Sequence, residues 1–246
     1  MSTKPTRTVK QRDGKIVTYF TENKLWVKAF ASGRYAWEKR NRKYAQTLVK
    51  SPDVVIDLGA NIGQEAMQYA SWARKVYSFE PNPVIYEVLD LNIHQNGINN
   101  VELIQKGASD SAGSAVINNL RANEGRSYVC DHNGKHTLPI ELVTVDDFLL
   151  PNIEGRVDFV KMDVEGHEVH ALKGMRKLIE KFWPVFQVEA EDECLERCGY
   201  NSTHIWDFFN ELGYVATINT GEVIPREKAL TDDRDKVDLF FTKTKE

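Results

Sequence analysis

The sequence predicts an α/β fold in which helices cover both faces of an open, mostly parallel sheet. The apolar run at residues 54–56 and the mostly apolar stretch at residues 157–162 are predicted to be buried strands, and a helical pattern follows each of them. Further strand and helix patterns alternate between them along the chain. Alternation of this kind is typical of parallel strands joined by crossover helices, so we expect a doubly wound sheet.

The first buried strand runs into a glycine turn, residues 57–63 (DLGANIG), and a helix is expected from residue 64 to residue 74. Glycines let the backbone approach a ligand, and a helix N-terminus offers unpaired N–H groups. Dinucleotide sites require G-x-G-x-x-G and a P-loop requires Gly-Lys-Ser/Thr, whereas these glycines are spaced G-x-x-x-G. The turn therefore favours S-adenosylmethionine, whose amino-acid end carries charge but no phosphate. The alternative is a turn with a structural role alone.

The second expected strand, residues 75–80, ends in Glu80, which lies 21 positions after Gly59. This is about the separation at which an acidic residue of Rossmann-like sites meets the ribose hydroxyls. Asn82 and Pro83 have the residue types of an N-cap and a first helical position. A third strand leads to the small-residue turn 107–110, which we expect at the same edge of the sheet.

The fourth expected strand ends in a run of ionisable side chains, residues 161–168 (KMDVEGHE). Because open α/β sheets bind their ligands at the carboxyl ends of the strands, we assign Asp163 and Glu165 to a site. Glu168 is interpreted instead as a residue that favours the N-terminus of the following helix. A fifth strand follows at residues 185–188 and is succeeded by Glu189.

The segments outside this core are less informative. Two closing strands are expected at residues 214–218 and 237–241. Short alternating segments between residues 113 and 139 predict a β-hairpin insertion that covers the substrate. Its histidines, His132 and His136, form too weak a pattern to predict a metal site.

The chain of 246 residues, 41% of them hydrophobic, has the size of one globular domain with appended pieces. We expect an N-terminal extension over residues 1–50, flexible at first and then helical, and a Rossmann-like domain over residues 51–246. A net charge of -4 gives no global attraction to nucleic acid, and the basic cluster at residues 38–43 is interpreted as a solvated helix face. Without a recognisable membrane span, signal peptide or zinc-finger set of cysteines, the expected location is the cytoplasm.

Three motifs, taken in order, resemble those of FkbM-type methyltransferases, an S-adenosylmethionine-dependent branch of the Rossmann-like class. They lie at residues 55–63, 79–83 and 158–168, and residues 172–174 belong to the same pattern. The resemblance implies a seven-stranded sheet whose last strand is antiparallel. It also implies O-methylation of a sugar, a polyketide or another small molecule. The sequence departs from the family at residues 189–191 (EAE), and residues 1–50 match no known pattern, so the substrate stays open.

The resemblance also assigns site residues. The expected cofactor-binding residues are Asp57, Gly59, Ala60, Asn61, Gly63, Glu80, Pro81, Ala108, Ser109 and Asp163. The expected catalytic residues, among which a general base is sought, are Asp163, Glu165, His167 and Glu189. Histidine has the best-matched ordinary pKa, but the residue types do not rank the four. A divalent metal on the carboxylates, which would lower the pKa of the acceptor hydroxyl, is an alternative that we do not predict.

Other classes of function share part of this pattern. An NAD-linked oxidoreductase has the strand, the glycine turn and the ribose-binding acid, but not this glycine spacing. A non-catalytic module that binds S-adenosylmethionine, or a methyltransferase acting on nucleic acid or protein, would keep the cofactor site. An acidic pI of about 5.9 argues against nucleic acid. The expected partner is a small-molecule acceptor, with a sugar as one candidate; no membrane partner is expected, and the oligomeric state is not indicated.

Overall fold

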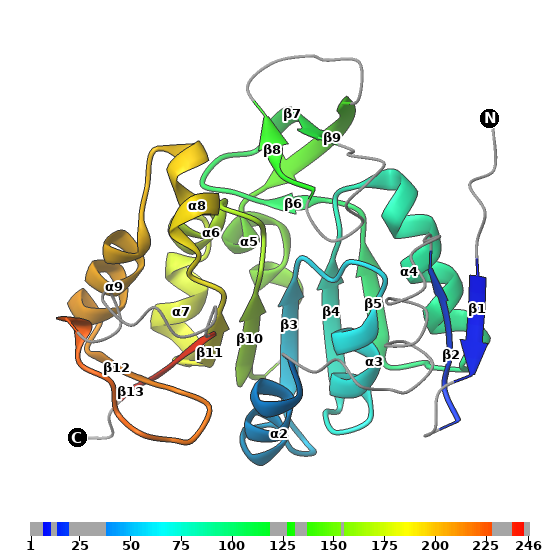
Figure 1. The fold of residues 1–246 in the computed structure, drawn as a ribbon, viewed down its shortest axis with the longest axis horizontal. Helices are drawn as coiled ribbons and strands as arrows, with labels where there is room; N and C mark the ends of the chain where they lie inside the picture. The colour runs from blue at the N-terminus through cyan, green and yellow to red at the C-terminus, as the bar shows by residue number, and fades with distance from the viewer. Residues whose placement is uncertain are drawn as a thin grey trace.

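A computed structural model describes residues 7–10, 14–19, 38–118, 127–130, 137–153, 155–227 and 238–243. Within these ranges the strands form three sheets, of seven, four and two strands. Figure 1 shows the seven-stranded sheet in the middle of the molecule, with the four-stranded sheet above the carboxyl ends of its parallel strands. This arrangement brings the small sheet over the edge where a ligand is expected.

The central sheet has the strand order β12-β13-β11-β10-β3-β4-β5. In chain order these strands are β3 (Val54–Leu58), β4 (Lys75–Phe79), β5 (Val101–Ile104), β10 (Phe159–Met162), β11 (Val185–Val188), β12 (Tyr214–Thr217) and β13 (Leu239–Lys243). Strand β13 is antiparallel to β11 and β12, and the other neighbours pair in parallel. The prediction of a seven-stranded, mostly parallel sheet with an antiparallel last strand is therefore confirmed.

Helices cover both faces of this sheet. One face carries α2 (Glu38–Leu48), α3 (Gln64–Ala70) and α4 (Pro83–Gln95); the other carries α5 (Val145–Phe148), α6 (Glu168–Lys173), α7 (Arg176–Phe182) and α9 (Ser202–Glu211). Because side chains alternate along a strand, Val55 of β3 packs on the first face and Ile56 on the second. Both are fully buried, which explains why this strand appears in the sequence as an unbroken apolar run.

The start of α4 follows from its sequence. Oδ1 of Asn82 accepts hydrogen bonds from the N–H groups of Val84 at 3.0 Å and Ile85 at 3.4 Å. Pro83 stands at the first helical position, where its missing N–H costs nothing. Both expectations are confirmed, and the cap fixes the turn that joins β4 to α4, directly beside Glu80.

The small sheet has the order β6-β9-β7-β8, with β6 (Gly107–Ala108), β7 (Gly113–Asn118), β8 (Val129–Cys130) and β9 (Thr137–Val143). Strands β7 and β9 are antiparallel, as expected of a hairpin insertion. However, the sheet extends to Val143, beyond the expected limit of residue 139. It also includes Gly107 and Ala108, which we expected in a turn and which pair in parallel with β9. His132 and His136 lie outside the described residues.

Two N-terminal elements pack on the core. Strands β1 (Arg7–Lys10) and β2 (Ile16–Tyr19) form a hairpin, and the side chain of Asn92 on α4 hydrogen-bonds both the N–H and the carbonyl of Thr18 at 2.7 and 3.0 Å. Helix α2 lies in the expected helical part of the extension, and Ala45 on it is buried against the sheet; residues 20–37 lie outside the described ranges. The division of the chain at residue 50 stays a prediction.

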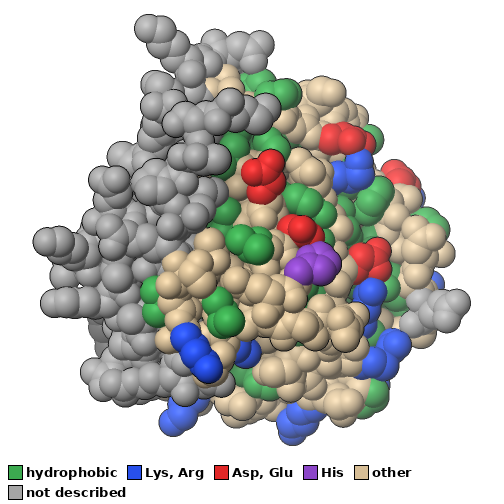
Figure 2. Space-filling view, turned by 90° about the vertical axis from the view of Figure 1, so that its right-hand side faces the viewer, with side chains coloured by type: hydrophobic (Ala, Val, Ile, Leu, Met, Phe, Trp, Pro, Cys, Tyr) green, Lys and Arg blue, Asp and Glu red, His purple; other side chains and the backbone are tan. Residues whose placement is uncertain are grey.

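Charged side chains are dispersed over the described surface. Arg40 and Lys43 on α2 are exposed while Asn41 is buried, so these two members of the basic cluster lie on the solvated side of the helix. In Figure 2, acidic, basic and hydrophobic side chains are interspersed over the described part of the face. None of the helices in the described ranges has the length and apolar character that crossing a bilayer requires.

Candidate cofactor and acceptor site

A cleft lies at the carboxyl ends of β3, β4 and β10, beneath the small sheet. It contains about 700 Å³ of empty space, including the part open to solvent. The expected site residues that line it are Gly59, Asn61, Glu80, Pro81, Ala108, Asp163, Glu165 and His167. The other expected residues, which stand behind or beside the cleft wall, are Asp57, Ala60, Gly63, Ser109 and Glu189. The structure thus brings most of the two expected sets to one cavity.

Gly59 lets the ends of β3 and β10 approach each other closely. Its φ of +82° is in the left-handed region, and a Cβ atom there would lie 1.8 Å from the carbonyl oxygen of Asp163. Only glycine accepts both the backbone conformation and the contact. The glycine therefore has a steric function that the sequence alone does not show: it sets the position of the Asp163 backbone.

The glycine turn has no N–H group left for a phosphate. The five successive N–H groups of residues 59–63 donate within the protein, at 2.7–3.0 Å, to the carbonyl oxygens of Phe79 and Ala60 and to side-chain oxygens of Glu80 and Asn61. A phosphate-binding loop requires such groups to be free and to converge on the anion. This geometry supports the exclusion of phosphate at the turn that the glycine spacing suggested.

Glu80 joins two turns at the wall of the cleft. Its Oε2 accepts from the N–H of Asn61 at 2.9 Å, and its Oε1 accepts from the N–H of Asn82 at 2.8 Å. Burial raises the pKa of Glu80 to about 7, against the lowering effect of the two N–H groups. Each oxygen keeps a second lone pair, which a ribose hydroxyl donor can use.

Asp57 does not line the cleft. It is wholly buried, and neither carboxyl oxygen has a hydrogen-bond partner among the described residues. Burial raises the pKa of Asp57 to about 7, while the charge of Lys161 lowers it. The side chain lies on the sheet face that α3 covers, opposite Lys161 in the β3–β10 register. Its expected contact with the amino group of the cofactor stays a prediction.

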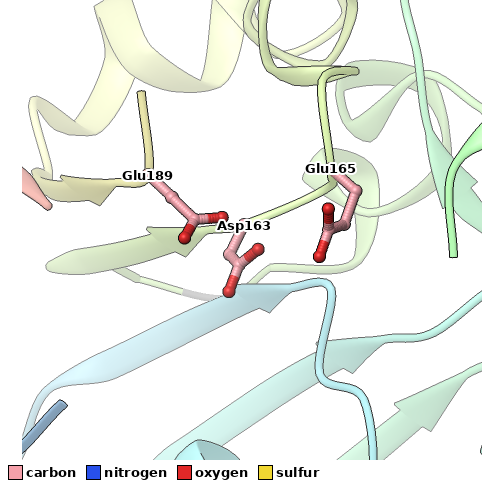
Figure 3. A group of neighbouring side chains, drawn as sticks. All are labelled: Asp163, Glu165 and Glu189. Carbon is pink, nitrogen blue, oxygen red and sulfur yellow. The ribbon is translucent and has the colours of Figure 1, made fainter. Parts of the chain in front are cut away.

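Three carboxyl groups from two neighbouring strand ends meet in the acceptor half of the cleft. Asp163 and Glu165 follow β10, Glu189 follows β11, and one oxygen of each lies within 4.8 Å of the others. Figure 3 shows the three side chains converging above the end of β3. Glu165 has a left-handed backbone, with φ of 55°, and accepts a hydrogen bond from Sγ of Cys194 at 3.5 Å. The metal alternative stays untested.

Asp163 and Glu189 differ in their tendency to be ionised. The ammonium group of Lys161 lies 3.0 Å from Oδ2 of Asp163, and the carboxyl group of Glu189 also hydrogen-bonds Asp163. Burial raises the pKa of Asp163, but the charge of Lys161 and these hydrogen bonds bring it below its ordinary value. The negative charge of Asp163, together with burial, raises the pKa of Glu189 strongly. These opposite directions favour an ionised Asp163 with the proton of the pair on Glu189.

His167 lines the cleft and contacts two side chains beside it. Its Nε2 lies 3.0 Å from Oγ of Ser109, and its ring stacks on His170 with the centroids 4.4 Å apart. Burial, with the neighbouring His170, lowers the pKa of His167 to about 4. Ser109 thus contacts His167 and stands behind the wall, while Ala108 faces the cleft.

Glu168 has the structural role expected of it. It begins α6, and its Oε1 accepts from the N–H groups of Val164 at 3.0 Å and Gly166 at 3.2 Å. These contacts fix the loop that carries Glu165 and His167 into the cleft.

Two lysines without an expected role lie at the site. Lys106 lines the cleft, and its ammonium group is 2.5 Å from Oε1 of Glu141 on β9. Lys106 stands in a polar connection, where nothing in the sequence marks it. Lys161 stands within an apolar strand, and this is itself a signal, because a charged side chain is seldom buried without a partner.

Comparison with known proteins gives the family. Residues 57–216 match the pattern of the Methyltransferase FkbM domain, which is more than half of the chain. The hexuronic acid methyltransferase AglP of Haloferax volcanii is 27% identical over 151 residues, covering 58% of this chain and 62% of that protein. The methyltransferase sdnD of Sordaria araneosa is 27% identical over 191 residues, covering 61% of this chain and 74% of that protein. The match therefore spans less than two thirds of the Haloferax protein.

Solved structures agree on the fold. An FkbM methyltransferase of Methylobacillus flagellatus superposes with a TM-score of 0.51 at 20% identity, covering 77% of this chain and 43% of that chain. A Streptococcus mutans protein, solved in complex with S-adenosylhomocysteine, has a TM-score of 0.52 at 11% identity, covering 85% and 98%. Taken with the matched domain pattern and the observed sheet order, these comparisons show that the chain belongs to the FkbM methyltransferase family.

Proposed function

We propose that this protein transfers the methyl group of S-adenosylmethionine to a hydroxyl group of a small molecule. The observation that carries the proposal is the composition of one cleft. At one end is a glycine turn that offers nothing to a phosphate, next to an acid placed for a ribose. At the other end is a group of carboxyls, one of them ionised. Family membership supports the same activity.

Different residues of the cleft wall would contact different parts of the cofactor. Bound S-adenosylmethionine supplies the reactive methyl group on its sulfonium. Glu80 would accept hydrogen bonds from the ribose, and Pro81 and Ala108 would flank the adenine. Gly59 and Asn61 would face the methionine end. The residues behind the wall, Asp57, Ala60, Gly63 and Ser109, would hold this surface in shape.

The acceptor half needs alignment and a place for one proton. Methyl transfer is an in-line displacement at carbon, so most of the rate enhancement should come from orientation of the acceptor oxygen. Asp163 is the first candidate for general base, because it lines the cleft and is ionised. Glu165 also lines the cleft and is the second candidate. Glu189 holds a proton and is a weaker candidate, whereas His167 is neutral at pH 7 and stays a third candidate.

A sugar is the acceptor that we favour. A relative that is 27% identical is named as a hexuronic acid methyltransferase, and it is the source of this preference. A polyketide or another hydroxylated small molecule would suit the same chemistry. Methylation of nucleic acid or protein, and a role in cofactor binding alone, are the outcomes against which the proposal is tested.

The experiment is transfer of labelled methyl from S-adenosylmethionine to a panel of acceptors: hexuronic acids, neutral hexoses, a phenolic polyketide, RNA and a peptide mixture. We expect label on a sugar hydroxyl, and loss of it in Asp163→Asn while that variant still binds the cofactor. Lys177→Ala, at an exposed position on α7, serves as a control that should transfer normally. Label on RNA or peptide alone would overturn the acceptor class. Cofactor binding without transfer to any acceptor would indicate a non-catalytic module.

A further inference from the structure

Lys161 is a buried cation in the middle of the central sheet. It stands on β10, and its side chain is 7% exposed. In the strand registers it faces Asp57 on β3 and Gln187 on β11, so the three side chains share one face of the sheet. A lysine at such a place needs a strong reason, because burying an ammonium group is costly without partners.

Acidic side chains from several elements surround the ammonium group of Lys161. Asp57 comes from β3, Glu65 comes from α3, and Asp163 follows β10, while Tyr69 on α3, whose pKa is raised by burial, adds a neutral phenol beside them. Burial by itself lowers the pKa of Lys161, but the charges of Asp163 and Asp57 raise it above its ordinary value. The ammonium group therefore stays charged, and its direct hydrogen bond is with Asp163, at 3.0 Å. Asp238, before β13, faces the same group of charges and hydrogen-bonds Gln187.

Asp163 connects this buried charge to the cleft. Its side chain is 35% exposed, against 7% for Lys161, so one end of the contact faces ligand space and the other does not. Asp163 also receives a hydrogen bond from Glu189, which lies beyond the end of β11. The carboxylate is thus held by donors from two strands. Two hydrogen bonds of this kind restrict both the position and the orientation of a carboxylate.

We propose that Lys161 is a positioning residue of the transfer reaction: it holds Asp163 as the ionised carboxylate that takes the acceptor's proton, while Glu189 keeps its own proton. The inference rests on the proposed function. In the step it serves, the hydroxyl O–H bond breaks and its proton goes to Asp163. The oxygen forms the new bond to the methyl carbon as the carbon–sulfur bond breaks, and that electron pair stays on sulfur. Asp163 later releases the proton to solvent.

A purely structural role is the competing explanation. A buried ion pair contributes little net stability, since the cost of desolvation offsets most of the attraction. Lys161 would then affect folding and nothing specific at Asp163. The two explanations differ in what happens to the proton affinity of Asp163 when the ammonium group is removed.

The test is a carbon-13 NMR titration of protein labelled at the aspartate carboxyl carbon, with the Asp163 signal identified by its loss in Asp163→Asn. In the wild type, we expect Asp163 to titrate below the ordinary aspartate midpoint. In Lys161→Met, the midpoint should rise by about one pH unit or more, a gain of about tenfold in proton affinity. Lys161→Arg, which keeps the charge, should stay close to the wild type.

Lys75→Met is the matched control. Lys75 also stands on a strand of the sheet and contacts a carboxylate, Glu102, at 2.8 Å, but that carboxylate is 51% exposed and both residues lie away from the cleft. This variant should leave the Asp163 signal unmoved. An unchanged midpoint in Lys161→Met, or an equal shift in Lys75→Met, would overturn the inference. If Lys161→Met does not fold, a wild-type Asp163 that titrates above the ordinary aspartate midpoint would overturn it by itself.

The titration needs neither cofactor nor acceptor, so its failure is distinct from a failure of the proposed function. With an acceptor in hand, turnover adds a second readout. Lys161→Met should lose about fivefold or more in turnover one pH unit below its own Asp163 midpoint, where the wild-type carboxylate is still at least half ionised, and should recover nearly all of it two units above that midpoint, because the base is then deprotonated again. A structural defect would lower turnover by the same factor at both pH values.

Discussion

Replacing Gly59 with alanine probes the contact that positions the acceptor half of the site. The new Cβ would lie 1.8 Å from the Asp163 carbonyl oxygen, while ordinary Cβ contacts begin at about 3.0 Å. The ends of β3 and β10 must therefore separate by more than an ångström. A left-handed alanine costs about 1–2 kcal/mol, and overpacking of this kind adds about 1–3 kcal/mol. The expected loss of stability is about 2–5 kcal/mol, which for a chain of this size lowers Tm by roughly 10 °C.

Gly97→Ala is a matched control for the backbone cost. Gly97 also has a positive φ, +64°, but no atom lies within 4 Å of the position of a new Cβ. Only the conformational cost of about 1–2 kcal/mol applies there, a drop of roughly 3–5 °C. The difference between the two variants isolates the contact with Asp163.

Thermal unfolding followed by circular dichroism measures both variants, and calorimetry measures binding of S-adenosylmethionine. Gly59→Ala should melt well below Gly97→Ala and should bind the cofactor at least about tenfold more weakly, since a displaced Asp163 backbone distorts the cleft wall. Equal Tm values for the two variants would refute the steric argument. Wild-type affinity in Gly59→Ala would show that the wall tolerates the displacement.

Two further predictions concern stability and pH. Burial raises the pKa of Asp57 to about 7 from 3.8, so the wild type loses stability as pH rises through 7. Asp57→Asn should therefore be more stable than the wild type at pH 8, by up to about 4 kcal/mol. At pH 5 its advantage should be smaller. Urea unfolding at both pH values tests this, and an advantage independent of pH would contradict it. Burial lowers the pKa of His167 to about 4 from 6.5, so its contribution to stability is lost as pH falls below 6.5. His167→Gln should therefore avoid about 2 kcal/mol of the loss at pH 5, and an acid loss equal to that of the wild type would contradict this assignment.

Much of the fold was predictable because its signals are local. The buried strands are short and mostly apolar, and Asn82 followed by Pro83 marks the start of α4. The sequence limits of the hairpin insertion were less predictable. Gly107 and Ala108 form a strand only two residues long, which leaves no periodicity to detect, and their pairing with β9 is set by distant residues.

The site shows the same division between local and distant causes. The residue types at the ends of β3, β4 and β10 identified the cleft, since parallel strands end at one edge. The motifs do not predict in which direction each side chain points or whether it is ionised. Asp57 lies behind the wall because its register places it on the α3 face, opposite Lys161. Glu189 is a proton donor because Asp163 is its neighbour, and their pairing depends on the register between β10 and β11.

Calorimetric titration of the wild-type protein with S-adenosylmethionine and, separately, with NAD tests the central claim most directly. Glu80→Ala is the variant to compare, because Glu80 stands where a ribose would bind and supports the glycine turn. The account predicts that S-adenosylmethionine binds at one site per chain, that Glu80→Ala loses most of this affinity, and that NAD does not bind. Binding of NAD in place of S-adenosylmethionine, or full affinity for S-adenosylmethionine in Glu80→Ala, would contradict it.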